Sequence, residues 1–281
     1  MILTPTDFSD NANHAIDYAI ALAKQIKDKI LLVNAYLIPV AETTYPPAFI
    51  GDEIKRAEFS SNHHLKMRCA SITAEDGVSC NYISEFGEPT KVILDIISKI
   101  KPSLVVMGTH GATGLKAMFV GSNTSQVIAK SEAPVIAVPA LSKFRELKRI
   151  IYTTDFHKSD IRVLEYLLKL FGNYQPHIQI THIYDGDFLE SQQNELSEFK
   201  KKVADKISYQ DLSFKLLHVQ NVLHELGTLS RSKNYDLLVM SNHPRSLFDR
   251  FINRSMTKAI ALKTEIPLLV MHHIEESVVV S

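Results

Sequence analysis

The chain of 281 residues contains an internal repeat, which constrains its fold more than any other feature. Residues 2–8 read ILTPTDF and residues 150–156 read IIYTTDF, a shift of 148 positions. Residues 102–110 read PSLVVMGTH and residues 235–243 read YDLLVMSNH, a shift of 133. Two tandem copies of one supersecondary unit explain this pattern. We predict domains at 1–141 and 148–274, and a deletion of 15 residues between the second and third strands of the second copy.

Each copy alternates apolar strands with helices of 3.6-residue periodicity. In the first copy we predict strands at 2–4, 29–37, 78–84, 103–108 and 134–139, and helices at 10–27, 51–75, 89–100 and 122–131. In the second copy we predict strands at 149–153, 177–184, 212–218, 236–240 and 267–272, and helices at 158–172, 188–207, 221–232 and 255–263. Strands that are apolar throughout indicate a parallel sheet covered on both faces. The predicted fold class is α/β, with two tandem open, doubly wound parallel-sheet (Rossmann-like) domains.

Charge and cysteine content exclude several classes of protein. Lysine plus arginine equals aspartate plus glutamate, 31 of each, so no nucleic-acid or membrane partner is expected. The two cysteines, Cys69 and Cys80, form no CxxC motif, which predicts buried thiols in a reducing compartment rather than a disulfide or a metal site. The first residues lack the pattern of a signal peptide, and no apolar run is long enough to span a bilayer. The predicted location is cytoplasmic.

A glycine-rich segment follows the fourth strand of the first copy. Gly108, Gly111 and Gly121 precede a helix that starts at Ser122 and Asn123. Unpaired amides at a helix N-terminus favour anions, and glycine lets the backbone approach phosphate closely. The Ser122 hydroxyl and nearby amides could complete this cradle. The spacing matches neither the P-loop nor GxGxxG, so a simple turn-forming role for the glycines is the alternative.

The spacing Gly108-x-x-Gly111, nine residues, Gly121-Ser122 resembles the ATP-binding signature of the universal stress protein family. The flanking segments TPTDFSD, VVMGTHGATGL and APVIAVP also resemble segments of that family. The resemblance implies that ATP binds with Mg²⁺ in the first domain. It implies roles at the base and nucleoside for Pro5, Thr6, Asp7, Ala35 and Met107, and at the ribose and phosphates for Gly108, Gly111, Gly121, Ser122 and Asn123. Asp7 would accept a hydrogen bond from the adenine amine; its structural alternative is a helix cap or turn residue.

The second copy departs from this pattern. Ser241, Pro244, Leu247 and Arg254 stand where the first copy has its four glycines, counting Gly114, while Asp155 keeps the position of Asp7. Proline removes an amide donor and arginine fills space near the phosphates. We therefore predict that the second domain does not bind ATP in the family manner. An anion site made by Arg245, Arg250 and Arg254 is the rival idea, and a solvated basic loop is preferred over it.

The predicted function is a nucleotide-binding stress-response module. No catalytic residue and no metal-ligand cluster is recognised in the sequence, so at most weak ATP hydrolysis is expected. The alternatives are a nucleotide-independent interaction scaffold and an ATP-using enzyme of the same broad α/β group. Family resemblance also suggests pairing of the segments PVIAVP and PLLVM into an intramolecular pseudo-dimer. A homodimer through domain edge strands and an unknown protein partner are further expectations.

Overall fold

The computed structural model describes residues 1–37, 47–109, 122–140, 142–187, 189–243, 247 and 264–272, with residues 47–50 described by their backbone alone. The described residues form two compact units. Those up to Ala140 belong to the first unit, and those from Ser142 onward belong to the second.

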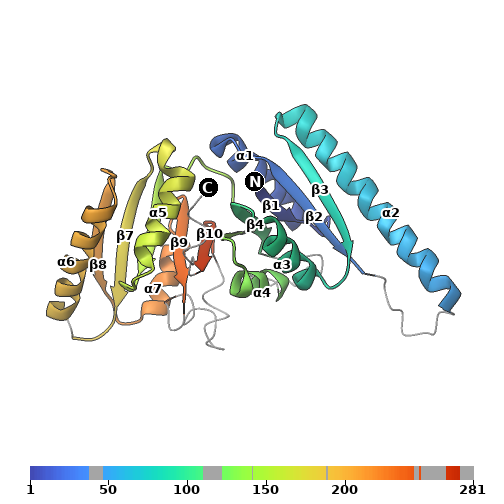
Figure 1. Cartoon of the computed structure of the whole chain (residues 1–281). Coiled ribbons are helices and arrows are strands. Elements are labelled where there is room, and N and C mark those ends of the chain that lie inside the picture. The colour runs from blue at the N-terminus through green and yellow to red at the C-terminus, as the bar shows by residue number, and fades with distance from the viewer. Residues whose placement is uncertain are drawn as a thin grey trace. The chain divides into compact units, whose positions relative to one another are not determined.

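The first unit is an open parallel sheet (Figure 1). Its strands lie in the order β3-β2-β1-β4-β5, so β1 occupies the centre. The elements are β1 (Ile2–Pro5), α1 (Asp10–Ile26), β2 (Ile30–Tyr36), α2 (Pro47–Ser71), the π-helix η1 (Ile72–Asp76), β3 (Cys80–Phe86), α3 (Pro89–Ile100), β4 (Leu104–Gly108), α4 (Ser122–Lys130) and β5 (Val135–Val138). The chain leaves β1 towards β2 and later reaches β4 on the other side, which is the doubly wound arrangement.

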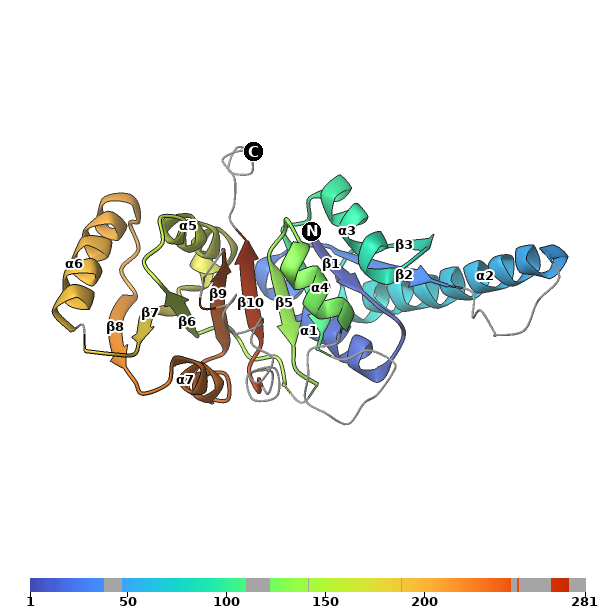
Figure 2. The same ribbon diagram turned by 90° about the horizontal axis from the view of Figure 1, so that it is seen from below.

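Helices cover the sheet because their apolar residues form stripes. In α1 the buried residues recur at helical spacing, from Ala12, Ala15 and Ile16 to Ala19 and Ala23. Helices α3 and α4 lie side by side in Figures 1 and 2 and contact each other. Right-handed crossovers on either side of β1 account for helices on both faces.

Helix α2 packs along β3 through a narrow stripe. Ser61, Leu65, Cys69 and Ile72 are buried at spacings of four, four and three residues, which is one face of a helix. Phe59 and Met67 point away from this stripe and are 74% and 59% exposed.

Within the described part of the chain, no helix is both long and apolar enough to cross a membrane.

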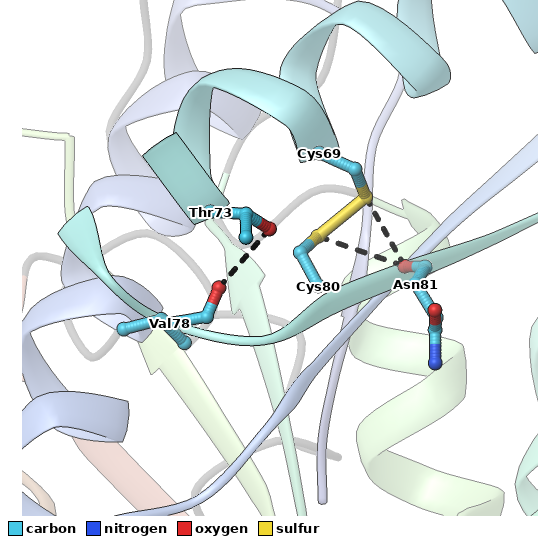
Figure 3. The surroundings of a disulfide bond; sticks show 5 residues. All are labelled: Cys69, Thr73, Val78, Cys80 and Asn81. Carbon is cyan, nitrogen blue, oxygen red and sulfur yellow. Dashed lines mark hydrogen bonds between the residues drawn. A yellow bond between two sulfur atoms is a disulfide. The ribbon is translucent and has the colours of Figure 1, made fainter. Parts of the chain in front are cut away.

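A disulfide joins Cys69 of α2 to Cys80 at the start of β3 (Figure 3), so the expectation of two free thiols is wrong in this structure. The Cα atoms are 5.2 Å apart, a normal separation for a disulfide. Both sulfur atoms also lie near the backbone carbonyl of Asn81, at 3.3 and 3.7 Å. The chain turns back through η1, which brings together two cysteines that lack a recognisable motif.

The second unit repeats the strand arrangement of the first, in the order β8-β7-β6-β9-β10. Its elements are β6 (Arg149–Thr154), α5 (Asp160–Phe171), the 3₁₀-helix η2 (Gly172–Tyr174), β7 (His177–Tyr184), α6 (Leu189–Lys206), β8 (Leu212–His218), α7 (Val222–Leu229), β9 (Leu237–Asn242) and β10 (Leu268–His272). The predicted helix at 255–263 lies outside the described residues. The expected fold class, an α/β fold of two doubly wound parallel sheets, is confirmed.

The strand register agrees with the internal repeat. Ile2 pairs with Ile30 in the first unit, and Ile150 pairs with Ile178 in the second, so the 148-residue shift holds in both strands. The next pairing differs, because Ile30 pairs with Cys80 whereas Ile178 pairs with Leu212. The second unit is therefore shorter between its second and third strands, where α6 replaces the longer α2 and η1.

Candidate functional site

The candidate site of the first unit lies at the carboxyl edge of its central strands. β1 pairs with β2 on one side and with β4 on the other. Ligands of doubly wound sheets bind at this edge, where the chain changes direction of winding. Pro5 ends β1, Ala35 lies near the end of β2, and Met107 and Gly108 end β4. The structure thus brings these predicted residues to one edge.

The loop after β1 is held in a tight turn by its own side chains. The Thr6 hydroxyl accepts a 3.0 Å hydrogen bond from the amide of Phe8. Asp7 Oδ1 accepts from the amide and the hydroxyl of Ser9, at 3.1 and 2.6 Å. Phe8 itself has φ of 63°, which non-glycine residues seldom adopt. Ser9, rather than Asp7, caps α1 by accepting from Ala12.

The position of Asp7 suits both a structural and a binding role. It is a turn residue, as its hydrogen bonds to Ser9 show, yet its side chain is exposed at the edge of the sheet. Thr6, in contrast, is buried with 6% exposure, and Pro5 is also buried. Only Asp7 of these three can present charge to a ligand without rearrangement.

A buried polar chain supports this loop from behind. The Asn34 side-chain amide donates to the carbonyl of Thr6 at 2.7 Å, and the Ser61 hydroxyl donates to Asn34 Oδ1 at 2.6 Å. Ser61 also lies 2.6 Å from the Ser84 hydroxyl. Asn34 and Ser61 are 5% and 3% exposed. Our reading of the sequence missed both, although an asparagine inside the apolar strand LLVNAY was the available signal.

The end of β4 and the start of α4 face the same edge. Met107 is 5% exposed, so most of its side chain belongs to the core, and Gly108 is half-buried. The Thr124 hydroxyl donates to the Gly108 carbonyl at 2.8 Å and fixes α4 to the end of the strand. Ser122 and Asn123 are exposed in the first turn of α4. Gly111 and Gly121 lie outside the described residues, as do His110 and Gly114.

The equivalent edge of the second unit carries a cluster of titratable groups. His243 Nε2 lies 3.0 Å from Asp155 Oδ1. The Thr154 hydroxyl hydrogen-bonds Asp160 Oδ2, and the Ser241 hydroxyl lies 3.4 Å from Asp160 Oδ1. Asp160 is fully buried. Burial raises its pKa from 3.8 to about 6, and the nearby hydroxyl groups of Thr154 and Tyr152 oppose that rise.

Three ligand-type atoms meet in this cluster. One atom each from Asp155, Asp160 and His243 lies within 4.8 Å of the other two, the only such group found among the described residues. His157 stacks on His243, with 4.1 Å between ring centroids. The cluster was missed in the sequence because its members come from segments far apart in the chain, and because Asp160 resembles an ordinary first-turn residue of a helix. Pro244 and the arginines at 245, 250 and 254 lie outside the described residues.

The described residues of the two histidine pairs, 63–64 and 272–273, differ in environment. His63 and His64 of α2 are both exposed, whereas His272 is half-buried at the end of β10. His272 lies near the Asn242 amide, at 3.1 to 3.3 Å, and residue 273 lies outside the described part.

The first unit matches a known family. The model of the universal stress protein family matches residues 1–139. Universal stress protein YxiE of Bacillus subtilis is 30% identical over 143 residues, which cover 49% of this chain and 97% of that protein. Universal stress protein Sll1388 of Synechocystis is also 30% identical, over 149 residues, covering 49% of this chain and 96% of that protein.

The likeness of fold extends over both units. A crystal structure of a universal stress protein from Archaeoglobus fulgidus has a TM-score of 0.72, covering 97% of this chain and 98% of the other at 16% identity. At that identity the match shows similarity of fold alone. Taken with the sequence matches over the first half, it completes the case: the chain belongs to the universal stress protein family.

Proposed function

We propose that the first unit binds ATP, with Mg²⁺ held through the phosphates, and that the second unit has lost this activity. The observation that carries the proposal is that an exposed carboxylate, Asp7, and the exposed first turn of α4 both lie at the carboxyl edge of the central strands. A carboxylate can accept from the adenine amine, and amides at the start of a helix can bind phosphate. Family membership and the glycine spacing support the same assignment.

The proposed roles of the residues follow the parts of ATP, from the base to the phosphates. Asp7 accepts from the base, while Pro5, Thr6 and Ala35 line its pocket and Met107 borders the nucleoside. Gly108 and Gly111 lie along the ribose and phosphates, and Gly121, Ser122 and Asn123 hold the phosphates. The hydrogen bond from Thr124 to Gly108 supports this assignment, because it keeps the helix start next to the end of β4.

The second unit supports the contrast between the copies. Ser241 replaces Gly108 in the aligned repeat, and its side chain is buried beside Asp160. The aspartate at the position of Asp7, Asp155, is already paired with His243. We infer a structural or interaction role for this unit, in place of ATP binding. A nucleotide-independent scaffold remains the second candidate for the whole chain.

A calorimetric titration of the full chain with Mg-ATP tests the proposal. We expect about one site per chain, as the repeat comparison implies. Asp7→Asn should weaken binding by about tenfold, the value of one hydrogen bond to a charged group. Asp155→Asn, the matched change in the second unit, should leave the affinity unchanged.

Two outcomes would contradict the assignment. Binding that survives Gly121→Asp undiminished would exclude the phosphate site, since that change places a carboxylate against phosphate. A folded chain, free of co-purified nucleotide, that binds no ATP would favour the scaffold. ATP turnover faster than about 1 s⁻¹, the low end for typical enzymes, would instead revive the enzyme alternative.

The location and assembly of the chain stay predictions. The disulfide removes one argument for a reducing compartment, because disulfides are rare in cytosolic proteins. Cell fractionation tests the cytoplasmic location, and light scattering of the purified chain tests the homodimer.

A further inference from the structure

We propose that the second unit holds a divalent transition-metal ion, of the Zn²⁺ class, between Asp155, Asp160 and His243. The three side chains come from the loop after β6, the start of α5 and the end of β9, at the edge of the sheet where ligands of this fold bind. This site is independent of the ATP proposal, which concerns the other unit.

The ligand atoms are close enough to share one ion. Asp155 Oδ1 and His243 Nε2 are 3.0 Å apart, and all three ligand atoms lie within 4.8 Å of one another. Two ligands at about 2.1 Å from a tetrahedral zinc ion stand about 3.4 Å apart. Because none of the three separations exceeds 4.8 Å, small adjustments of the side chains would complete this geometry.

The charges of the cluster call for a cation. Asp160 is fully buried, the Asp155 side chain is 23% exposed, and His243 is 9% exposed. Across the described residues, neither carboxylate forms an ion pair with a lysine or an arginine. Buried charges in proteins are normally paired or coordinate a metal. One histidine cannot neutralise two carboxylates, so a dication would complete the charge balance.

The hydroxyl of Tyr152 is a further polar group beside the proposed metal site. The Tyr152 hydroxyl is fully buried and makes no hydrogen bond of acceptable geometry. It nevertheless lies close enough to Asp160 for the two groups to affect each other's pKa. Buried hydroxyls without a partner are uncommon. A metal-bound water or a shifted Asp160 carboxylate would give the Tyr152 hydroxyl its missing partner.

The internal repeat shows that the second unit differs from the first around Asp160, although Asp155 and His243 align with Asp7 and His110. The 148-residue shift aligns Asp160 with Ala12 and Tyr152 with Thr4, and the 133-residue shift aligns Ser241 with Gly108. An alanine, a glycine and a threonine of the first unit thus correspond to Asp160, Ser241 and Tyr152 of the second. These three side chains lie next to one another. Loss of a phosphate site alone does not require new buried polar groups. Their joint presence indicates a different ligand.

The donor set selects the class of metal. One imidazole and two carboxylates suit zinc, manganese or iron(II), whereas all-oxygen sets suit magnesium and calcium. Three protein ligands leave a fourth position open for water or a small anion. Thr154 orients Asp160 through its hydroxyl, as outer partners orient ligands in known metal sites.

The test is a calorimetric titration of the chelator-treated full chain with Zn²⁺, repeated with Mn²⁺ and Mg²⁺. We expect one zinc site per chain, and weak or no Mg²⁺ binding. Asp160→Asn and His243→Gln should each weaken zinc binding by more than about 100-fold, the upper end of what loss of an outer partner costs. Circular dichroism checks that each variant folds, and Asp155→Asn replaces either variant that does not.

The chain offers a matched control in its other aspartate–histidine pair. His177 Nδ1 and Asp211 Oδ1 are 2.6 Å apart, but their side chains are 40% and 57% exposed, and no third ligand joins them among the residues that the structure describes. His177→Gln should leave the zinc site intact. Equal binding by wild type, Asp160→Asn and His243→Gln would assign the zinc to surface histidines and overturn the proposal. A folded wild-type chain that binds no zinc would also overturn it.

Discussion

The side-chain amide of Asn34 donates a 2.7 Å hydrogen bond to the backbone carbonyl of Thr6, and so fixes the loop that carries Asp7. The loop is therefore positioned by the second strand as well as by its own turn. Ser61 completes the support by donating to Asn34 from α2. The candidate site depends on a helix that has no predicted ligand contact.

Ser61→Ala should destabilise the protein by about 1–3 kcal/mol, the cost of leaving a buried acceptor unsatisfied. Urea unfolding measures this change. Ser60→Ala is the matched control, because Ser60 is the preceding residue of α2 and is exposed. Equal stability of the two variants would show that the buried hydroxyl chain does not support the loop.

The disulfide should stabilise the first unit. Cys69 and Cys80 are 11 residues apart, and closing a loop of this length is worth about 3 kcal/mol in the chain-entropy description. We expect reductant to lower the free energy of unfolding by about this amount. The chain has two cysteines only, so the double variant Cys69→Ala, Cys80→Ala should not respond to reductant. Two titratable thiols in the air-oxidised, unfolded protein would contradict the bond.

Glu88 should make the stability of α3 depend on pH. Its carboxylate caps the helix by accepting from the amides of Lys91 and Thr90, at 2.7 and 3.0 Å. The hydrogen bond from Lys91 is the main cause that lowers the Glu88 pKa below 4.5. Because the folded pKa is the lower one, the stabilisation is present above about pH 4.5 and is lost as pH falls through the folded pKa.

The variant Glu88→Ala should therefore cost about 1 kcal/mol at pH 7 and much less at pH 3. Chemical unfolding at both values measures the difference. Glu58→Ala, an exposed carboxylate within α2, serves as control and should show no comparable pH dependence. A cost for Glu88→Ala that is equal at both pH values would contradict a charge-dependent cap.

Most of the secondary structure follows from sequence periodicity. Helix α3 spans Pro89–Ile100 as predicted, because its apolar stripe is strong and a proline stands in the first turn. The ends of α2 were harder to predict, because its buried stripe is narrow and because the helix continues as the π-helix Ile72–Asp76. Regular elements with one strongly apolar face were the predictable part.

The site was predictable only in part. Asp7 and Gly108 were proposed from the opening segment TPTDFSD and from the glycine spacing, and both lie at the same edge of the sheet. The disulfide and the cluster around Asp160 depend on contacts between distant segments, which spacing does not reveal. Asp155 and His243, for instance, are 88 residues apart and meet because β6 and β9 are neighbours.

Phe156 has φ of 59°, almost the same as Phe8 at the aligned position of the first unit. This left-handed conformation costs about 1–2 kcal/mol for a residue with a side chain, and both copies retain it. The backbone path after the first strand is therefore common to two units whose side chains differ at this edge. Divergence of the two copies replaced side chains on a shared turn and left the course of the main chain unchanged.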